Sequence, residues 1–304
     1  MRTRFPPFLR KGDLIGITCP AGYMPREKAA TCIQQLQRWG YEVLVGRTLG
    51  SGSATYFSGT DEERRSELQA MLDAPEVKAI LCGRGGYGTG RIIEQLDFTA
   101  FRKHPKWIIG FSDITVLHAH IYRNFGISTL HAPMAAAFND GGYRNRYVQS
   151  LRHQLEGRHL QYSCPAHTLN RPGTAEGPLV GGNLALLAHL VGTESDLPTR
   201  GRILFLEDVG EQLYNIDRML TQLRRSGKLQ GLRGLLVGGF TDNADTERPF
   251  GQTAFGIIAS HLHPFRFPVC FDFPVSHTSR NYALKHGAPC RLTVTSNRVL
   301  LEEL

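Results

Sequence analysis

The first half of this chain alternates short apolar runs with polar segments of helical period, and this alternation limits the folds open to it. The apolar runs have the length of strands, and the segments between them place apolar residues every three or four positions. The expected strands are 14–19, 41–45, 78–82, 107–111 and 128–131, and the expected helices are 26–39, 61–72, 90–96 and 114–124. Strands that alternate with helices form a parallel sheet covered by helices on both faces. Asp61 is the expected N-cap of its helix.

The second half of the chain has a different pattern. A polar stretch rich in glycine and proline separates the halves, and it holds one expected helix, 144–155, with no buried strand after it. Beyond it we expect an apolar helix opened by Gly181-Gly182-Asn183 and strands at 202–206, 234–238, 269–273 and 291–295. A chain of 304 residues is long enough for two domains. The predicted division is a doubly wound, flavodoxin-like or Rossmann-like α/β domain at 1–140, a linker at 141–175 and a smaller β-rich domain at 176–304.

The charge balance makes an anionic partner the first candidate. The chain has 35 Lys and Arg against 27 Asp and Glu, a formal net charge of +8. Nucleic acid is the first such partner to test. The basic residues are scattered, however, and their densest groups are Arg144 with Arg146 and Arg224 with Arg225, with no aromatic residues interleaved in a recognisable nucleic-acid module. We therefore expect no nucleic-acid partner.

Cysteine and histidine spacing gives no sign of a metal site. The six cysteines form no Cys-x-x-Cys pair, which argues against a zinc site and against a disulfide framework. His118 and His120 are two positions apart on an expected helix and point in different directions, as do His261 and His263. No apolar run has the length of a signal peptide or a membrane span. The expectation is a cytoplasmic protein with reduced thiols, no metal, no cofactor and no membrane partner.

Three distant segments end in a hydroxyl, a carboxylate and an imidazole. They are Gly110-Phe111-Ser112-Asp113, Phe205-Leu206-Glu207-Asp208 and Pro274-Val275-Ser276-His277. A serine hydroxyl is a weak nucleophile at neutral pH, so acyl transfer requires an imidazole to take its proton and a carboxylate to orient the imidazole. The three segments together supply the parts of a serine hydrolase.

Ser112 stands where an expected strand changes into a helix. A serine on a sharp strand-to-helix turn is held away from the sheet, and the amides of the first helical turn face any charge that develops beside it. The same position suits a simple helix N-cap, because serine is among the preferred capping residues. The sequence Gly-Phe-Ser-Asp-Ile also lacks the final glycine of the hydrolase elbow. Local sequence leaves both interpretations open.

A glycine-rich loop, Gly83-Arg84-Gly85-Gly86-Tyr87-Gly88, follows an expected strand and precedes a helix. It satisfies G-x-G-x-x-G, so a dinucleotide-binding oxidoreductase is a competing hypothesis. The motif follows an inner strand, though, and no strand ends in an acidic residue about twenty positions later. A second use for the loop is close backbone approach to a reacting carbonyl. One glycine amide and the amide of Asp113 would then stabilise the oxyanion.

The acid and the histidine each have alternatives. Glu207 and Asp208 follow an apolar run and point to opposite faces of a strand, so only one of them can orient a histidine. Glu211 is a further candidate. His277 lies in a polar loop after a short strand, while His131 and His286 are not excluded by spacing.

Taken together, these segments resemble the LD-carboxypeptidase family of serine peptidases, the muramoyltetrapeptide carboxypeptidases. The matching motifs, in family order, are Gly12-Asp13-Leu14-Ile15-Gly16-Ile17 with Pro20-Ala21-Gly22, Arg84-Gly85-Gly86-Tyr87-Gly88, Gly110-Phe111-Ser112-Asp113, Gly181-Gly182-Asn183-Leu184, Leu206-Glu207-Asp208, and Pro274-Val275-Ser276-His277 with Asn281. The resemblance implies Ser112 as nucleophile, His277 as general base and then acid, and Glu207 as the orienting carboxylate. It also implies oxyanion donors at the amides of Asp113 and Gly86, and a site between two domains. Ser276 departs from the family pattern, which usually has glycine there.

The activity implied by the resemblance is a cytoplasmic carboxypeptidase of cell-wall recycling. It would remove terminal D-Ala from murein tetrapeptide by cutting the bond after the L-centre of meso-diaminopimelate, and a homodimer is implied as well. Arg84 and Arg280 are the candidates for holding substrate carboxylates, because an exopeptidase must bind a free carboxylate.

Two alternatives to this activity remain, a peptidase with another substrate and a protein that is not an enzyme. A peptidase that inactivates a peptide-nucleotide antibiotic, as in the microcin-resistance branch of the family, would need an aromatic residue to stack on a base. Trp39 and Trp107 are the only tryptophans, and neither lies in an expected site loop. A catalytically silent ligand-binding protein is the other alternative, and it would be unaffected by loss of Ser112.

Overall fold

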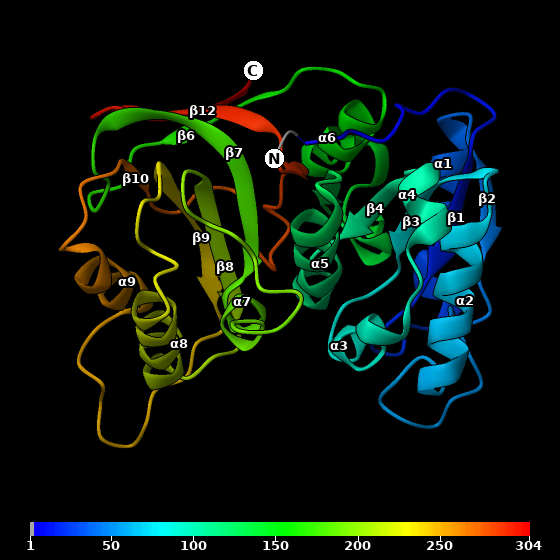
Figure 1. Ribbon diagram of the computed structural model, residues 1–304, viewed down its shortest axis with the longest axis horizontal. Helices are drawn as coiled ribbons and strands as arrows, with labels where there is room; N and C mark the ends of the chain where they lie inside the picture. Colours follow the sequence, from blue (N-terminus) through cyan, green and yellow to red (C-terminus); the bar gives the residue numbers. More distant parts are fainter. Residues whose placement is uncertain (1–2) are drawn as a thin grey trace. The chain divides into compact units, whose positions relative to one another are not determined.

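The computed structural model describes residues 3–304, apart from the side chain of Tyr143, and it divides into two compact units (Figure 1). Unit 1 runs to Arg158 and also includes Tyr282–Lys285. Unit 2 comprises His159–Asn281 and His286–Leu304. Met1 and Arg2, the start of the first expected domain, lie outside the described residues.

Unit 1 is built on a mostly parallel sheet whose strand order is β11-β5-β4-β3-β1-β2. Its strands are β1 (Leu14–Thr18), β2 (Glu42–Val45), β3 (Val77–Cys82), β4 (Trp107–Gly110), β5 (Thr129–His131) and β11 (Leu284–His286). Strands β1 to β5 all pair in parallel. The order 2-1-3-4-5 is flavodoxin-like, and it reverses direction between β1 and β3, where such folds bind ligands at the carboxyl ends of the strands. The prediction of a doubly wound α/β domain is confirmed.

Helices cover both faces of this sheet. They are η1 (Arg26–Ala29), α1 (Ala30–Arg38), α2 (Asp61–Asp73), α3 (Thr89–Ile92), η2 (Ile93–Gln95), α4 (Thr99–Lys103), η3 (Ser112–Ile114), α5 (Thr115–Phe125), η4 (Ala135–Asn139), η5 (Gly142–Arg144) and α6 (Arg146–Leu155). The helix α2 begins one residue after its cap, which is Thr60 and not Asp61. Thr60 and Glu63 form a reciprocal capping box that satisfies two backbone donors of the first turn.

Alternation along β1 explains which helix lies on which face. Ile15 and Ile17 point into the core that also contains Leu36 of α1 and residues of α6. Gly16 points to the opposite face, where a Cβ added to it would lie only 2.7 Å from the sulfur of Met71 in α2. The glycine therefore lets α2 approach the strand closely, and the sheet is covered on both sides.

Unit 2 has a mixed sheet with the order β10-β9-β8-β7-β12-β13-β6. Its strands are β6 (Gln161–Pro165), β7 (Gly173–Asn183), β8 (Ile203–Val209), β9 (Gly234–Thr241), β10 (Val269–Cys270), β12 (Pro289–Val294) and β13 (Arg298–Glu303), and its helices are α7 (Leu184–His189), α8 (Leu213–Arg225) and α9 (Ala254–Leu262). The long strand β7 pairs antiparallel with β12 in its first half and parallel with β8 in its second. Unit 2 is mixed and rich in β-structure, as expected.

The segment expected as a linker contains regular structure. Residues 141–175 include α6, which belongs to unit 1, and β6 with the start of β7, which belong to unit 2. The boundary between the units falls between Arg158 and His159. Alternating burial along β6 marks it as a half-buried strand, but its polar outward residues and neighbouring prolines hid that pattern in the sequence.

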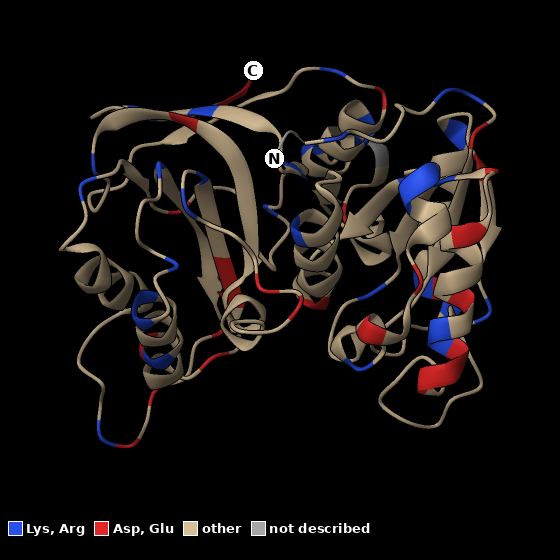
Figure 2. Cartoon of the chain, viewed as in Figure 1, with Lys and Arg blue, Asp and Glu red and all other residues tan. Residues whose placement is uncertain are grey.

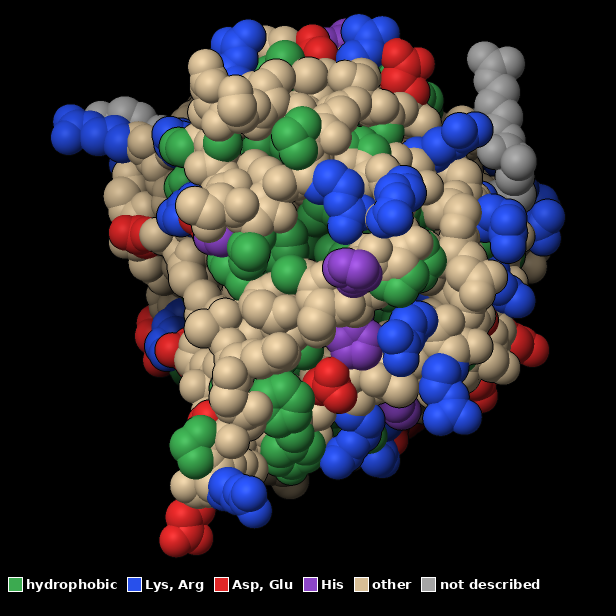
Figure 3. All heavy atoms as spheres, turned by 90° about the vertical axis from the view of Figure 1, so that its left-hand side faces the viewer, with side chains coloured by type: hydrophobic (Ala, Val, Ile, Leu, Met, Phe, Trp, Pro, Cys, Tyr) green, Lys and Arg blue, Asp and Glu red, His purple; other side chains and the backbone are tan. Residues whose placement is uncertain are grey.

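Charged side chains of both signs are interspersed over the chain. Helix α2 carries acidic and basic residues side by side, and within it Arg65 pairs with Glu62 (Figure 2). On the face shown in Figure 3, Lys and Arg side chains occur in small groups separated by neutral surface. No helix among residues 3–304 is long and apolar enough to cross a membrane.

Candidate active site

Ser112 occupies a strained turn directly after β4. Phe111 is extended, with φ −150° and ψ −170°, and Ser112 then has φ +63° before the chain enters η3 and α5. A left-handed conformation costs a residue with a side chain about 1–2 kcal/mol, so such residues persist only where their surroundings fix them. Buried Asp113 and Ile114 follow immediately and hold the turn in place. Ser112 itself is half-buried, with its side chain at the carboxyl end of the parallel sheet.

The glycine-rich loop after β3 lies against Ser112. A Cβ added to Gly85 would lie 3.1 Å from Ser112 Oγ, 2.9 Å from Ser112 Cβ and 3.3 Å from the amide nitrogen of Asp113. The absence of a side chain at Gly85 therefore leaves space beside the hydroxyl and the Asp113 amide. The sequence singled out Gly86 in this loop, but the residue that touches Ser112 is its neighbour Gly85.

Hydrogen bonds anchor this loop from both sides. The amide of Gly22 donates to the carbonyl of Gly85 at 3.0 Å. Because the C=O and N–H of a trans peptide point in opposite directions, the Gly86 amide points away from Gly22. On the other side of the loop, the buried side chain of Arg64 donates to the carbonyls of Pro20 and Gly88. The loop thus presents its amides from a fixed backbone.

Asp113 links the loop to the nucleophile turn through its side chain. Its carboxylate is buried, and Oδ2 accepts the amide of Thr89 at 2.8 Å. Burial raises the pKa of Asp113, while the hydrogen bonds from Thr89 and Gly88 and the charge of Arg64 oppose that rise. Thr89 is the first residue of α3, so the amide at the start of this helix is occupied by a protein carboxylate. A pyrophosphate at that helix end would have to displace Asp113, which makes the loop a poor dinucleotide site.

In unit 2, the strand β8 carries two buried carboxylates. The prediction placed them at the end of the strand, but β8 continues to Val209, so Glu207 and Asp208 lie within the sheet with 0% and 2% of their surface exposed. Burying an ionised carboxylate is costly unless it is paired or hydrogen-bonded. Each of the two has its own partners.

Glu207 is paired with His277. Nδ1 of His277 lies 2.6 Å from Oε2 of Glu207, and the His277 side chain is 17% exposed. Burial alone lowers the pKa of His277, but the hydrogen bond and charge of Glu207, with a contribution from Asp208, raise the pKa above its usual value. The carboxylate fixes the ring orientation and places the Nδ1 proton toward itself, which leaves Nε2 as the basic nitrogen of the neutral imidazole.

Asp208 holds backbone and side-chain amides instead. Its carboxylate accepts the side-chain amide of Asn183 at 2.7 Å and the backbone amide of Ala185 at 2.9 Å. Burial, together with the charge of Glu207, raises the pKa of Asp208 to about 7. Asp208 therefore fixes the start of α7, and of the two adjacent carboxylates only Glu207 reaches a histidine.

Two glycines in β9, which the sequence analysis did not single out, make room for the segment that carries His277. A Cβ on Gly238 would lie 2.1 Å from the carbonyl oxygen of Val275, and a Cβ on Gly239 would lie 2.5 Å from Cβ of Ser276. The amide of Gly239 also donates to the Val275 carbonyl at 2.9 Å. The available signal was the pair Gly238-Gly239 at the end of an apolar strand, because glycine inside a strand often marks close approach of another backbone.

The competing histidines have other roles. His286 is fully buried, and its Nε2 accepts the amide of Gly181 at 3.1 Å. His131 is fully buried in unit 1 beside the ring of Phe111. His118 donates to the carbonyl of Gly110, and burial lowers its pKa to about 4. Among the described residues, no group of three or more His, Cys, Asp or Glu is arranged to hold a metal ion.

The two candidate arginines are engaged with protein groups. Arg84 is exposed on the glycine-rich loop and donates through Nη1 to the carbonyl of Tyr23 at 2.7 Å. Arg280 lies three residues after His277 and pairs with Asp272, at 3.2 Å between Nη1 and Oδ2. The structure thus groups Ser112, Asp113 and the loop of Arg84 in unit 1, and Glu207, His277 and Arg280 in unit 2.

Comparison with known proteins agrees with these features. The family model described as the LD-carboxypeptidase N-terminal domain matches residues 15–132, and the LD-carboxypeptidase C-terminal domain matches residues 176–292. A probable murein peptide carboxypeptidase of Bacillus subtilis is 36% identical over 98% of this chain and 94% of its own length. The solved structure of muramoyltetrapeptide carboxypeptidase from Oxalobacter formigenes superposes with a TM-score of 0.86 at 28% identity, covering 95% of this chain and 98% of that one.

A more distant relative is a self-immunity protein. The microcin C7 self-immunity protein MccF of Escherichia coli is 25% identical over 97% of this chain and 94% of its own length. Both halves of the chain match family models, and the B. subtilis relative matches over nearly the whole length. The chain belongs to the LD-carboxypeptidase family of serine peptidases.

Proposed function

We propose that this protein is a serine carboxypeptidase that removes terminal D-Ala from murein tetrapeptide. The bond cut is that between the L-centre of meso-diaminopimelate and D-Ala, and the role is peptidoglycan recycling in the cytoplasm, by a homodimer. The observation that carries the proposal is the 2.6 Å pair of Glu207 and His277, because a buried carboxylate that fixes an imidazole is what a serine nucleophile requires. Family membership supports the choice of a murein peptide as substrate.

In the proposed mechanism, Ser112 Oγ attacks the scissile carbonyl while His277 Nε2 takes its proton. His277, then protonated and stabilised by Glu207, gives the proton to the amine of departing D-Ala. Water attacks the acyl-enzyme in the same way, with His277 again as the base, and releases the shortened peptide. The raised pKa of His277 suits a group that must hold the proton between these two transfers.

The oxyanion would be stabilised by backbone amides of Asp113 and Gly86. The position of Gly85 against Ser112 supports this assignment, because it leaves the Asp113 amide side of the hydroxyl uncovered. Amides held by the Gly22 and Arg64 hydrogen bonds need no rearrangement as the charge develops, and each such donor contributes roughly 10²–10³-fold in rate. Arg84, on the same loop, would hold the carboxylate of the terminal D-Ala.

The test is release of D-Ala from L-Ala-γ-D-Glu-meso-diaminopimelyl-D-Ala, followed by mass spectrometry of the shortened peptide. Wild type should give tripeptide, and Ser112→Ala and His277→Ala should lose several orders of magnitude in rate. Ser296→Ala and His263→Ala, which change exposed residues of the same types, are the matched controls and should stay active. Absence of tripeptide from folded wild type would reject the substrate.

A peptide-nucleotide substrate is the second candidate. Trp39 and Trp107 are buried in the core and offer no stacking surface. Tyr56, however, is 55% exposed, and its hydroxyl oxygen lies 2.8 Å from where a Cβ on Gly86 would be. An exposed aromatic ring beside the glycine-rich loop favours keeping this candidate, since every base has a face that can stack. Cleavage of an aspartyl sulfamoyl adenosine, with no release of D-Ala from murein peptide, would establish it.

A further inference from the structure

A pocket in unit 2 is lined by residues of the segment that carries His277, on both sides of that histidine in the sequence. Its volume is about 260 Å³, and its walls include Thr241, Asp272, Phe273, Ser276, Thr278 and Arg280. Ser276 and Thr278 are the immediate sequence neighbours of His277. Whole-ligand pockets measure roughly 300–1,000 Å³, so this one is of a size to hold part of a substrate. It therefore has the dimensions of a subsite, and both sequence neighbours of the proposed general base line it.

The pocket presents two opposite charges side by side. Asp272 and Arg280 are 3.2 Å apart, and their side chains are 47% and 48% exposed. An ion pair this exposed contributes only about 0–1 kcal/mol to stability, so a ligand that separates its two charges loses little. A guanidinium carries five N–H donors and binds a carboxylate with two of them, whereas a carboxylate accepts from an ammonium. The pair can thus receive both ends of a zwitterion.

The backbone around the pocket has the same left-handed conformation as the nucleophile turn. Asp272 has φ +55°, and Asp242, directly after Thr241, has φ +52°. Together with Ser112, these are the non-glycine residues with positive φ among residues 3–304. Aspartate adopts this conformation more readily than serine does, and positive φ values at residues other than glycine cluster at functional sites. The hydroxyl oxygen of Thr241 is also buried without a hydrogen-bond partner in the described structure, which leaves an unsatisfied polar atom at the pocket wall.

Arg280 is held by an ordered turn. Ser276 Oγ donates to the carbonyl of Arg280 at 3.0 Å and accepts the amide of Thr278 at 3.1 Å. The amide of Arg280 donates in turn to Thr278 Oγ1 at 3.2 Å. Ser276, where the resembling family usually has glycine, therefore fixes the backbone of the arginine. The guanidinium is presented to the pocket from a turn that is already formed.

We propose that this pocket binds a zwitterionic amino-acid head group, with Arg280 on its carboxylate and Asp272 on its ammonium. The inference rests on the proposed function, because the acyl residue of the proposed substrate, meso-diaminopimelate, ends in such a group at the tip of a short methylene chain. The pocket then selects the diamino acid that precedes D-Ala. A lysine residue in its place keeps the ammonium and lacks the carboxylate, so the two charges can be tested separately.

The experiment measures kcat/KM for two tetrapeptides, one with meso-diaminopimelate and one with L-lysine at the third position. Wild type should prefer the diaminopimelate peptide. Arg280→Gln should lower its kcat/KM by roughly 10–100-fold and affect the lysine peptide much less, because a charged hydrogen-bond donor is lost only where a carboxylate was bound. Asp272→Asn should lower both, since both substrates carry the ammonium.

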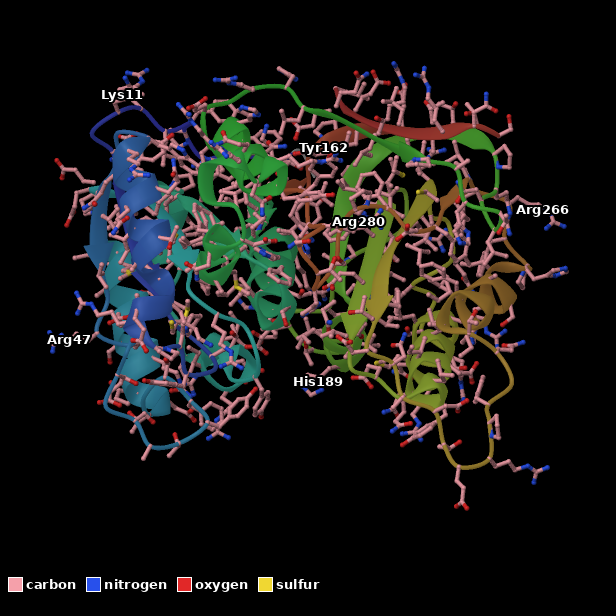
Figure 4. All side chains as sticks on the ribbon, turned by 180° about the vertical axis from the view of Figure 1, so that it is seen from behind. Lys11, Arg47, Tyr162, His189, Arg266 and Arg280 are labelled. Atoms are coloured by element: carbon pink, nitrogen blue, oxygen red, sulfur yellow. The ribbon has the colours of Figure 1, made fainter. Side chains whose placement is uncertain are left out.

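The matched control is Arg266→Gln. Arg266 is an exposed arginine of the same unit that extends outward from the segment after α9, as labelled with Arg280 in Figure 4, and it donates to backbone carbonyls of its own turn. This variant should leave both substrates unaffected. Equal cleavage of the two peptides by wild type, or an equal loss in Arg280→Gln for both, would overturn the inference while leaving the proposed function intact.

Calorimetric titration with meso-diaminopimelate itself tests the pocket in the case that neither peptide is cleaved. If folded wild type releases D-Ala from neither peptide, the proposed function fails. Binding of meso-diaminopimelate to wild type that is lost in Arg280→Gln would still support the pocket. No binding to wild type, together with no cleavage of either peptide, would reject both.

Discussion

The candidate site residues of unit 1 and those of unit 2 are held in place by different forces. Around Ser112, backbone geometry does the positioning: a positive φ, a glycine with no room for a Cβ, and a loop fixed by amide and carbonyl hydrogen bonds. Around His277, the charge of the fully buried Glu207 positions the imidazole through a hydrogen bond. The difference implies that added atoms near Ser112 lower activity through the backbone, whereas changes of charge or pH near His277 lower activity through the imidazole.

The largest expected effect is at the nucleophile. Two variants of Ser112 also test whether the backbone of its turn is strained. Ser112→Ala and Ser112→Gly should each lower kcat by at least about 10⁴-fold, because both lack the attacking oxygen. The glycine variant should nevertheless be the more stable of the two by about 1 kcal/mol, since glycine adopts φ +63° without strain. Thermal unfolding measures this difference. An alanine variant as stable as the glycine variant would show that the turn is not strained.

Replacing the charge that holds His277 should produce the next largest loss. Glu207→Gln should lower kcat by roughly 10³–10⁴-fold, because the imidazole loses the partner that fixes its tautomer. It should also move the acidic limb of the pH profile to lower pH: Glu207 raises the pKa of His277, and without it burial lowers that pKa.

The pH profile of kcat/KM for the residual activity tests this shift. Glu211→Gln, a change of a nearby glutamate that hydrogen-bonds Asn215, is the control and should leave the limb in place. A limb that stays at the wild-type pH in Glu207→Gln would mean that another group sets it.

An added methyl group beside Ser112 should lower kcat without any change of charge. Gly85→Ala would place Cβ 2.9 Å from Cβ of Ser112 and 3.3 Å from the Asp113 amide, so we expect a loss of roughly 10²–10³-fold in kcat. Gly90→Ala, which meets nothing within 4 Å and has no positive φ, is the matched control. Steady-state kinetics of both variants decide the point, and full activity in Gly85→Ala would show that this space is not used.

The smallest expected effect is on stability, at the second carboxylate. Asp208→Asn should lower the free energy of unfolding by about 1–3 kcal/mol at pH 4, because an amide NH₂ replaces one of the two carboxyl oxygens that face the Asn183 and Ala185 donors. The folded pKa of about 7 lies above the usual 3.8, so the folded state holds this proton more tightly than the unfolded chain. The stability that Asp208 contributes is therefore fully present below pH 3.8 and is lost as the pH rises to about 7.

The difference between wild type and Asp208→Asn should consequently be smaller at pH 8 than at pH 4. Denaturant unfolding at the two pH values measures it. Asp140→Asn, a change of an exposed aspartate, is the control. A gap that widens with pH would contradict the raised pKa.

Sequence patterns predicted most of unit 1 and less of unit 2. The five parallel strands of unit 1 are short apolar runs between clear turn signals, so each could be placed to within a few residues. Strands β6 and β13 are half polar, and β7 is interrupted by glycines, so their pairing depends on neighbours far away in the chain. The cap at Thr60 was missed because Asp61 is also a good capping residue.

The candidate site shows the same division. Residue types and motif order by themselves determined that Ser112 stands on a turn after a parallel strand, that a glycine loop precedes it, and that a carboxylate pair and a histidine follow. Residue types left the choice between Glu207 and Asp208 and among the histidines open, and the family resemblance implied Glu207 and His277. The tertiary structure showed that these two meet, and it alone decided that Gly85 is the glycine against Ser112. The reason is physical: local sequence fixes where a strand ends and a turn begins, whereas a contact between residues 70 positions apart depends on sheet pairing and on burial of charge.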